Sequence, residues 1–177
     1  MRSVCVFCGS KTGDAERHAA AARDLGAALA RRGLELVYGG GNIGLMGVLA
    51  DAVLAGGGSV IGVIPRFMVQ RELAHQGLTK LHLVDSMHER KALMAEHSDA
   101  IIALPGAFGT ADELFEMLTW RQLHLHDKPI GALNVAGFFD PLLSWLDVMV
   151  AEGFLTRNNR ELLIVRADVE ELLDAMS

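Results

Sequence analysis

Arg90 and Lys91 stand side by side in the first turns of a stretch with helical hydrophobic spacing. The helix dipole disfavours cations there, because the amino end of a helix carries partial positive charge. Such a pair either serves a ligand or carboxylate, or lies exposed to solvent, and the sequence leaves these alternatives balanced. Ser86 and Glu89 form a capping box that opens this stretch.

A second candidate for chemistry is the segment 104–113, LPGAFGTADE, in which a glycine-bearing turn follows an apolar run and precedes a helix. Amide groups at the start of such a helix favour an anion such as phosphate. Thr110-x-x-Glu113 also matches a capping box, with Thr110 as the N-cap residue and Glu113 three residues into the helix. Glu113 is therefore either a helix cap or a carboxylate available to a ligand.

Two further glycine-bearing loops follow apolar runs. Residues 8–13 carry GSKT without the spacing of a P-loop, so this loop either faces a ligand or is a tight turn. Residues 38–47 satisfy G-x-G-x-x-G before a helix. The acidic residue of a dinucleotide site, expected about 20 residues later, is missing from residues 59–64, which argues against NAD or FAD. Adjacent glycines still let a ligand approach the backbone.

Cys5 and Cys8 form a C-x-x-C, a spacing known from redox pairs and from half of a zinc site. They lie in a run that predicts a strand, where residues three apart point to opposite faces. We therefore interpret both as small buried hydrophobic residues. The seven histidines include no HExxH motif, and we expect no metal site.

The elements that must position these loops alternate along the chain. Apolar runs predict strands at 3–8, 34–38, 59–64, 81–84, 100–104, 129–133 and 162–165. Helical spacing covers 14–32, 44–55, 87–97, 111–123, 139–152 and 169–176. Several runs are apolar at nearly every position, as in parallel strands covered on both faces. The alternation predicts one α/β domain over residues 1–177. Its Rossmann-like, doubly wound, mostly parallel sheet has about seven strands, helices on both faces, and ligands beyond the carboxyl ends of the strands.

Composition narrows the class of protein further. The 177 residues, 51% of them hydrophobic and 21% charged, suffice for one domain with a real core. A net charge of −6 argues against a sequence-independent nucleic-acid binder, which needs a basic face. No run reaches the ~18 apolar residues of a membrane span, and the first residues lack the pattern of a secretory signal. We expect a cytoplasmic protein with neither a nucleic-acid nor a membrane partner.

Together these motifs resemble the LOG (Lonely Guy) family of cytokinin riboside 5′-monophosphate phosphoribohydrolases, whose bacterial relatives are often labelled possible lysine decarboxylases. The family pattern PGGxGTxxE is present at residues 105–113 as PGAFGTADE, and Met-x-x-Arg-Lys at 87–91 as MHERK. YGGGNIGLMG and HDKPIGALN are also typical, and the resemblance runs from residue 4 to about residue 154. Ala107 replaces the second glycine of the pattern. If that position needs φ > 0, alanine is strained by roughly 1 kcal/mol or more; if it needs close approach, the methyl group narrows the pocket.

The resemblance implies that Arg90 and Glu113 are the catalytic pair and that no cofactor takes part. The further substrate contacts that it implies are Lys91, Gly106, Ala107, Phe108, Gly109, Thr110, Glu72 and Thr119. From the two upstream loops we add Gly9, Ser10, Gly40 and Gly41 as ligand-facing residues. The resemblance also implies a homodimer or higher homo-oligomer with sites near the subunit interface.

The implied reaction is hydrolysis of the N-glycosidic bond of an adenosine 5′-monophosphate, plain or N6-modified, to free base (adenine or cytokinin) and ribose 5-phosphate. Positive charge develops on the sugar during such cleavage. Glu113 near a helix N-terminus is expected to be ionised, which suits stabilising the cation, attacking C1′ or activating water, but not donating a proton. Arg90 stays charged and either clamps Glu113 or holds phosphate. The proton donor to the leaving base is left unassigned.

Two alternatives from other classes stay open on sequence alone. One is a nucleotide or cofactor carrier on the same fold without chemistry, against which the presence of both Arg90 and Glu113 argues. The other is a pyridoxal-phosphate lysine decarboxylase, which needs a Schiff-base lysine. No lysine stands in a loop that we can assign to that task.

Overall fold

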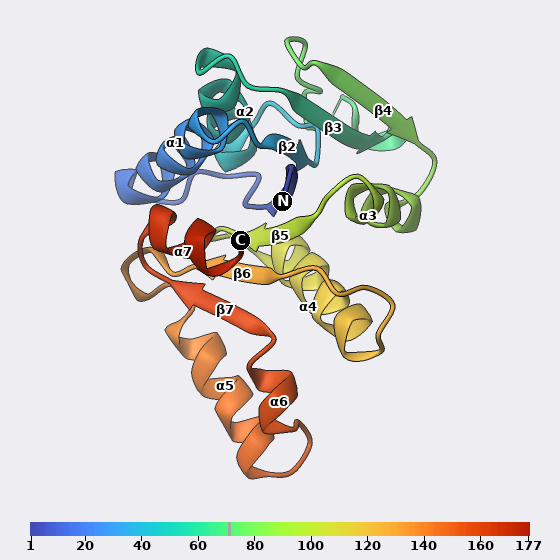
Figure 1. Cartoon of the computed structure of the whole chain (residues 1–177). Coiled ribbons are helices and arrows are strands. Elements are labelled where there is room, and N and C mark those ends of the chain that lie inside the picture. Colours follow the sequence, from blue (N-terminus) through green and yellow to red (C-terminus); the bar gives the residue numbers. More distant parts are fainter. Residues whose placement is uncertain (71) are drawn as a thin grey trace.

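The computed structural model describes residues 1–70 and 72–177. All seven predicted strands are present: β1 (Ser3–Phe7), β2 (Glu35–Tyr38), β3 (Val60–Pro65), β4 (Lys80–Val84), β5 (Ala100–Ala103), β6 (Ile130–Leu133) and β7 (Leu163–Arg166). They form one sheet in the order β4-β3-β2-β1-β5-β6-β7, and every pairing is parallel (Figure 1). The strand order reverses between β1 and β5. The doubly wound prediction is confirmed, and this reversal marks where a ligand crevice belongs.

The helices follow the predicted stretches closely. They are α1 (Glu16–Arg31), α2 (Gly44–Ala55), α3 (Met87–Glu96), α4 (Phe108–Gln122), α5 (Asp140–Ala151), α6 (Arg157–Arg160) and α7 (Val169–Ala175). Short 3-10 turns occupy Arg66–Met68 and Val135–Gly137. Two differences from the prediction stand out: α6 was not predicted, and α4 begins three residues earlier than residue 111.

Side chains that alternate along β1 separate the core into two layers. Val4, Val6 and Cys8 pack with α1, α2 and α7 on one face of the sheet. Cys5 and Phe7 pack with α3, α4 and α5 on the other face. Both cysteines are free and buried, so their interpretation as small core residues facing opposite ways is confirmed.

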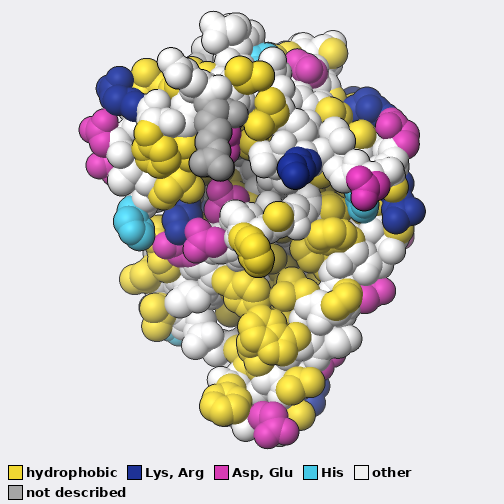
Figure 2. Space-filling model, turned by 180° about the vertical axis from the view of Figure 1, so that it is seen from behind, with side chains coloured by type: hydrophobic (Ala, Val, Ile, Leu, Met, Phe, Trp, Pro, Cys, Tyr) yellow, Lys and Arg dark blue, Asp and Glu magenta, His cyan; other side chains and the backbone are white. Residues whose placement is uncertain are grey.

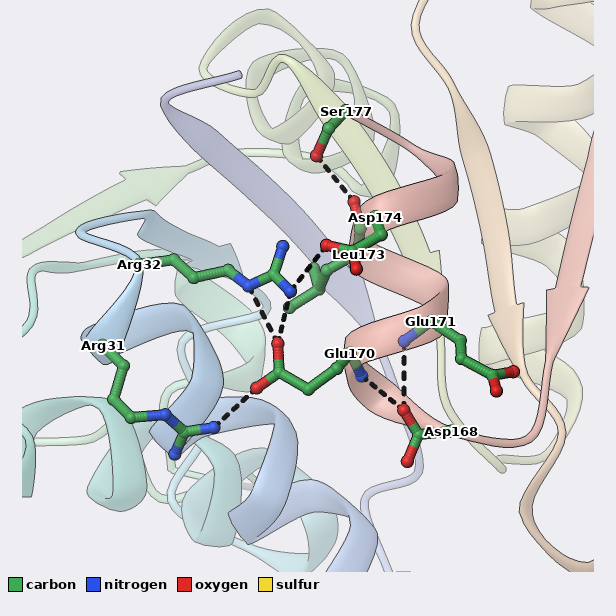
Figure 3. Close-up of polar contacts among 8 residues, drawn as sticks. All are labelled: Arg31, Arg32, Asp168, Glu170, Glu171, Leu173, Asp174 and Ser177. Carbon is green, nitrogen blue, oxygen red and sulfur yellow. Dashed lines mark hydrogen bonds and ion pairs between the residues drawn. The ribbon is translucent and has the colours of Figure 1, made fainter.

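Helix α7 returns the end of the chain to α1, near its beginning. Arg31 and Arg32, at the end of α1, pair with Glu170 and Asp174 of α7, with Arg32 lying 2.8 Å from the Asp174 carboxylate (Figure 3). Because these side chains are largely exposed, such pairs stabilise the fold little. Burial of Leu172, Leu173 and Met176 in the same layer as α1 holds the two helices together. In the part of the chain that the structure describes, no helix is long and apolar enough to span a bilayer.

Candidate active site

A cavity opens beyond the carboxyl ends of β1 and β5, where the strand order reverses. Its polar walls come from the loops after β1, β2 and β5, from α3 and α4, and from the segment between β3 and β4. These wall residues are Gly9, Ser10, Gly39, Glu72, Arg90, Ala107, Gly109, Thr110 and Glu113. The sheet topology therefore brings together motifs that are up to about 100 positions apart in the sequence.

Arg90 is the most firmly held charged group of this cavity. Its side chain is buried, and its Nε donates to the carbonyl of Val63 at 3.1 Å. Its Nη2 donates to the carbonyl of Gly39 at 2.7 Å and to the Glu72 carboxylate at 3.0 Å. A Cβ atom at position 39 would collide with the guanidinium, which explains the glycine there. The sequence alternative in which this arginine serves a carboxylate is therefore confirmed.

The remaining edge of the Arg90 guanidinium is available for a ligand. Within residues 1–70 and 72–177, the hydrogen-bond partners of Nη1 are the sulfur atoms of Met68 and Met87, at 3.7 and 3.9 Å. Thioether sulfur is a weak acceptor, so an oxygen of a ribose or phosphate makes a much stronger partner. This edge can bind a polar substrate group without giving up the bonds that hold the side chain.

Glu113 lies on α4 but does not cap it, and the predicted capping box at Thr110 and Glu113 is wrong. The helix begins at Phe108, after Ala107, so Glu113 is the sixth helical residue. Thr110 packs so tightly against Gly106 that a Cβ there would collide with its hydroxyl. The other capping box is confirmed for its serine, since Ser86 Oγ accepts from the backbone N–H of Glu89 at 3.1 Å.

The environment of Glu113 corrects the expectation that its carboxyl group is ionised at neutral pH. Burial raises the pKa of Glu113 to about 7. Arg90 lowers this pKa, whereas the carboxylates of Glu72 and Asp112 raise it. The expected ionisation rested on a position near the helix N-terminus, in the first turn, where the dipole acts most strongly. One turn further along and buried, the group loses hydration that the dipole does not replace.

Half of the twelve substrate-binding residues expected beside the catalytic pair lie on the cavity wall. They are Gly9, Ser10, Glu72, Ala107, Gly109 and Thr110. Ala107 has φ −107°, so the alternative in which alanine is strained there is wrong. Ala107 lines the cavity, as expected for the alternative of close approach.

Three of the other six expected residues lie outside the cavity wall, two of them with side chains held by other groups and one with its side chain in solvent. Lys91 forms ion pairs with Asp112 at 2.9 Å and with Glu116 at 3.0 Å, outside the cavity. Thr119 donates to a backbone carbonyl one turn earlier on α4. The side chain of Phe108 is 93% exposed. Their assignment to substrate binding is not supported by this geometry.

The last three expected residues are glycines, and none of them lies on the wall of this cavity. Gly106 lines a neighbouring cavity together with residues 9–13. Gly40 accepts the backbone N–H of His75 at 3.0 Å, and Gly41 forms an isolated bridge with Ala74. Gly40 and Gly41 therefore hold the segment that carries Glu72 and do not form the cavity wall.

Four methionines are among the cavity-lining residues that the sequence did not reveal, along with Gly39 and the end of β1. Met46, Met68, Met87 and Met94 all line the cavity. Met87 and Met94 stand three residues before and four residues after Arg90, which places all three on one face of α3. Helical spacing around Arg90 could have revealed these two. Met68 lies on a short irregular turn, where no periodicity gives a signal.

Comparison with known proteins decides the family. A family model described as possible lysine decarboxylase matches residues 46–176. A probable cytokinin riboside 5′-monophosphate phosphoribohydrolase of Oryza sativa subsp. japonica is 50% identical over 98% of this chain and 78% of its own. A cytokinin riboside 5′-monophosphate phosphoribohydrolase of Arabidopsis thaliana is 51% identical over 96% of this chain and 79% of its own. The chain belongs to the LOG family.

Two solved structures share the fold of this LOG family member. The molybdenum cofactor carrier protein of Chlamydomonas reinhardtii superposes with a TM-score of 0.75 at 23% identity, over 98% of this chain and 94% of that one. The molybdenum cofactor binding protein of Rippkaea orientalis has a TM-score of 0.72 at 19% identity, over 99% and 95%. At such identities the likeness shows the fold alone.

The description of the family model raises the question of a pyridoxal-phosphate site. That cofactor needs a lysine amine for its Schiff base. None of the described residues that line the LOG cavity is a lysine. Two lysines directly follow wall residues in the sequence. Lys91, after Arg90, is committed to the carboxylates of Asp112 and Glu116, and Lys11, after Ser10, lines the neighbouring cavity instead. The residues present do not fit the cofactor.

The raised pKa of Glu113 predicts that the folded protein is less stable when this carboxyl group is ionised than when it is protonated. Its pKa rises from 4.5 in the unfolded chain to about 7 in the folded protein, so the folded state binds the proton more tightly. The protein therefore loses stability as the pH rises from about 4.5 to 7, by roughly 3 kcal/mol in total. Glu113→Gln should be more stable than wild type at pH 8 and show no such advantage at pH 4.

Urea unfolding of both proteins across this pH range measures the difference. Glu171→Gln, which removes an exposed carboxylate of α7, is the control and should follow wild type. An unchanged free energy difference between wild type and Glu113→Gln at all pH values would contradict the burial argument.

Proposed function

We propose that this LOG family member hydrolyses the N-glycosidic bond of adenosine 5′-monophosphates, plain or N6-substituted, and releases the free base and ribose 5-phosphate. The observation that carries the proposal is the buried Arg90–Glu72 pair beside Glu113 in the switch-point cavity. The phosphoribohydrolase names of the 50% identical relatives support it. Hydrolysis of a glycosidic bond needs a proton for the leaving group and negative charge near the sugar, which carboxyl groups supply. Arg90 is the fixed cation beside the two carboxyl groups of this site.

Glu113 supplies the proton transfers in this proposal. With a pKa of about 7 it is protonated in a large fraction of molecules at neutral pH. It gives its proton to a ring nitrogen of the leaving base while the C1′–N bond breaks, and the bonding electrons leave with the base. The resulting carboxylate stabilises the positive charge on the sugar. It then accepts a proton from the water that attacks C1′, which restores the starting state.

Arg90 and Glu72 position the sugar phosphate in this mechanism. The two bonds from Arg90 to the backbone carbonyls of Val63 on β3 and Gly39 after β2 fix its guanidinium, so its Nη1 edge meets the substrate without reorganisation. Glu72 neutralises part of the Arg90 charge, which limits the repulsion between that cation and the developing charge on the sugar. Backbone amides near Gly109 and Thr110, at the start of α4, favour the 5′-phosphate.

The reaction itself gives the first test. Wild-type protein should release adenine from AMP or the substituted base from N6-isopentenyl-AMP, measured by chromatography. Glu113→Gln and Arg90→Ala should lower kcat by at least about 100-fold, because each removes a group that acts in the transition state. Wild-type-like turnover by either variant would contradict its assigned role. Nucleotide binding without any base release by wild type would favour the carrier alternative.

The pH dependence tests the protonated form of Glu113. Because the free enzyme must hold this proton before the base leaves, kcat/KM should fall tenfold per pH unit above about pH 7. A profile that instead rises through pH 7 would mean that the ionised carboxylate acts first. Steady-state kinetics between pH 5 and 9, with buffers matched in ionic strength, decide between the two.

We also propose that the chain forms a homodimer through the face built by α4 and α5. Phe115 of α4 packs edge-to-face on Trp145 of α5, with ring centres 5.9 Å apart. Trp145, Val148 and Phe154 are 53%, 55% and 88% exposed. Figure 2 shows hydrophobic side chains gathered over the lower half of that view, where Figure 1 places α5. Apolar patches of this kind are typical of interfaces.

A charge placed on this face should separate the subunits. Trp145→Glu should elute as a monomer of 19.1 kDa by light scattering, whereas wild type should have twice that mass. Leu83→Glu, on the exposed edge strand β4, is the control and should leave the mass unchanged. A dimeric Trp145→Glu would place the interface elsewhere.

A further inference from the structure

Glu72 stands on neither a strand nor a helix. It belongs to the irregular segment between β3 and β4, yet its carboxylate lies 3.0 Å from Arg90 Nη2 in a buried pair. A catalytic geometry of this kind tolerates little displacement, since an error of 1 Å can cost about 100-fold in rate. Something other than regular secondary structure must therefore fix the position of this side chain.

The backbone around Glu72 is held against the glycine-rich loop after β2. The N–H of Asn42 donates to the carbonyls of Glu72 and Leu73, at 3.1 and 2.9 Å. Leu73 has φ +48°, a left-handed backbone conformation that residues other than glycine rarely adopt. Such a strained residue persists only where its surroundings hold it. The backbone hydrogen bonds of this segment must therefore offset the conformational strain of Leu73, the residue next to Glu72.

The side chain of His75 supplies a second anchor, three residues after Glu72. Its ring is 8% exposed, and its Nδ1 accepts the backbone N–H of Gly77 at 3.0 Å. An accepting Nδ1 carries no proton, so the ring proton is on Nε2. Nε2 then donates to the Asp51 carboxylate on α2, also at 3.0 Å. The imidazole thereby ties the segment to a helix whose position the core determines.

Helix α2 does not itself need this bond. Its residues Leu49, Ala50 and Val53 are fully buried in the core layer. The Asp51 side chain is 69% exposed, and aspartate is a poorer helix former than alanine in the middle of a helix. The Asp51–His75 bond therefore contributes to the placement of the Glu72 segment and not to the formation of α2.

We propose that His75, held by Asp51, is a positioning residue that fixes the Glu72 carboxylate against Arg90 and so determines the rate of the hydrolysis. The inference rests on the proposed function and adds to it two residues outside the cavity wall. It also assigns a role to Gly40 and Gly41 in holding this segment. The Gly40 carbonyl accepts the backbone N–H of His75, and Gly41 forms the isolated bridge with Ala74.

Three variants distinguish the bond from His75 Nε2 to Asp51 from the bond that His75 Nδ1 accepts from Gly77. Asp51→Ala removes the acceptor, and His75→Asn keeps an acceptor near the place of Nδ1 but does not reach Asp51. Both should lower kcat roughly 10- to 100-fold with little change in KM and in the melting temperature. His75→Gln keeps a donor near the place of Nε2 and should recover most of the turnover. Asp24→Ala, an exposed aspartate on the neighbouring helix α1, is the matched control.

A merely structural role gives a different result. In that case Asp51→Ala and both His75 variants lower the melting temperature while kcat stays at the wild-type value, and the proposal is overturned. Action through Glu72 also requires that Asp51→Ala cause no further loss of kcat in a Glu72→Gln background. A full additional loss there would equally overturn it.

A crystal structure of Asp51→Ala tests the inference without activity. The Glu72 carboxylate should leave hydrogen-bonding distance of Arg90 Nη2, and a retained 3.0 Å contact would overturn the inference. This readout applies even if wild type releases no base from any nucleotide. Failure of the proposed function and failure of the positioning role are thus distinguished.

Discussion

A buried guanidinium is the constraint on which the rest of the site depends. Arg90 is 3% exposed, and a charge removed from water to this degree is tolerated only when oxygen partners surround it. Those partners are the carbonyls of Gly39 and Val63 and the carboxylate of Glu72. The glycine after β2, the end of β3 and the segment before β4 are therefore all shaped around one side chain of α3.

Burial of Glu113 has two effects: it lowers the stability of the folded protein and it suits the carboxyl group to proton transfer. A carboxyl group with a pKa of about 7 destabilises the folded protein at physiological pH, because its charged form is poorly solvated. That instability is what keeps a proton available for transfer near neutral pH. Arg90 moderates the effect, since without its positive charge the pKa would rise further. The site thus balances two buried acids against one cation.

The fold was predictable from the sequence to a greater degree than the site. Apolar runs and helical spacing place all seven strands and every helix except the four-residue α6. The signal is continuous in β1, β3, β5 and β6, which are buried on both faces, whereas the edge strand β4 is largely exposed. Arg90 and Glu113 were found through motifs at known spacing. Lys91 was assigned to the substrate, yet neighbouring carboxylates hold it. The pKa of Glu113 and the anchoring of Glu72 depend on contacts between distant segments, which local spacing does not encode.

The central position of β1 has a consequence for the newly synthesised chain. Of the seven strands, this one is synthesised first, and β2 can pair with it after about 30 further residues. Its other neighbour, β5, follows only at residues 100–103. Until then one edge of β1 is open, and the apolar side chains on the face later covered by α4 have no cover. An open strand edge of this kind is a template for pairing with other chains, so the growing chain is exposed to aggregation during this interval.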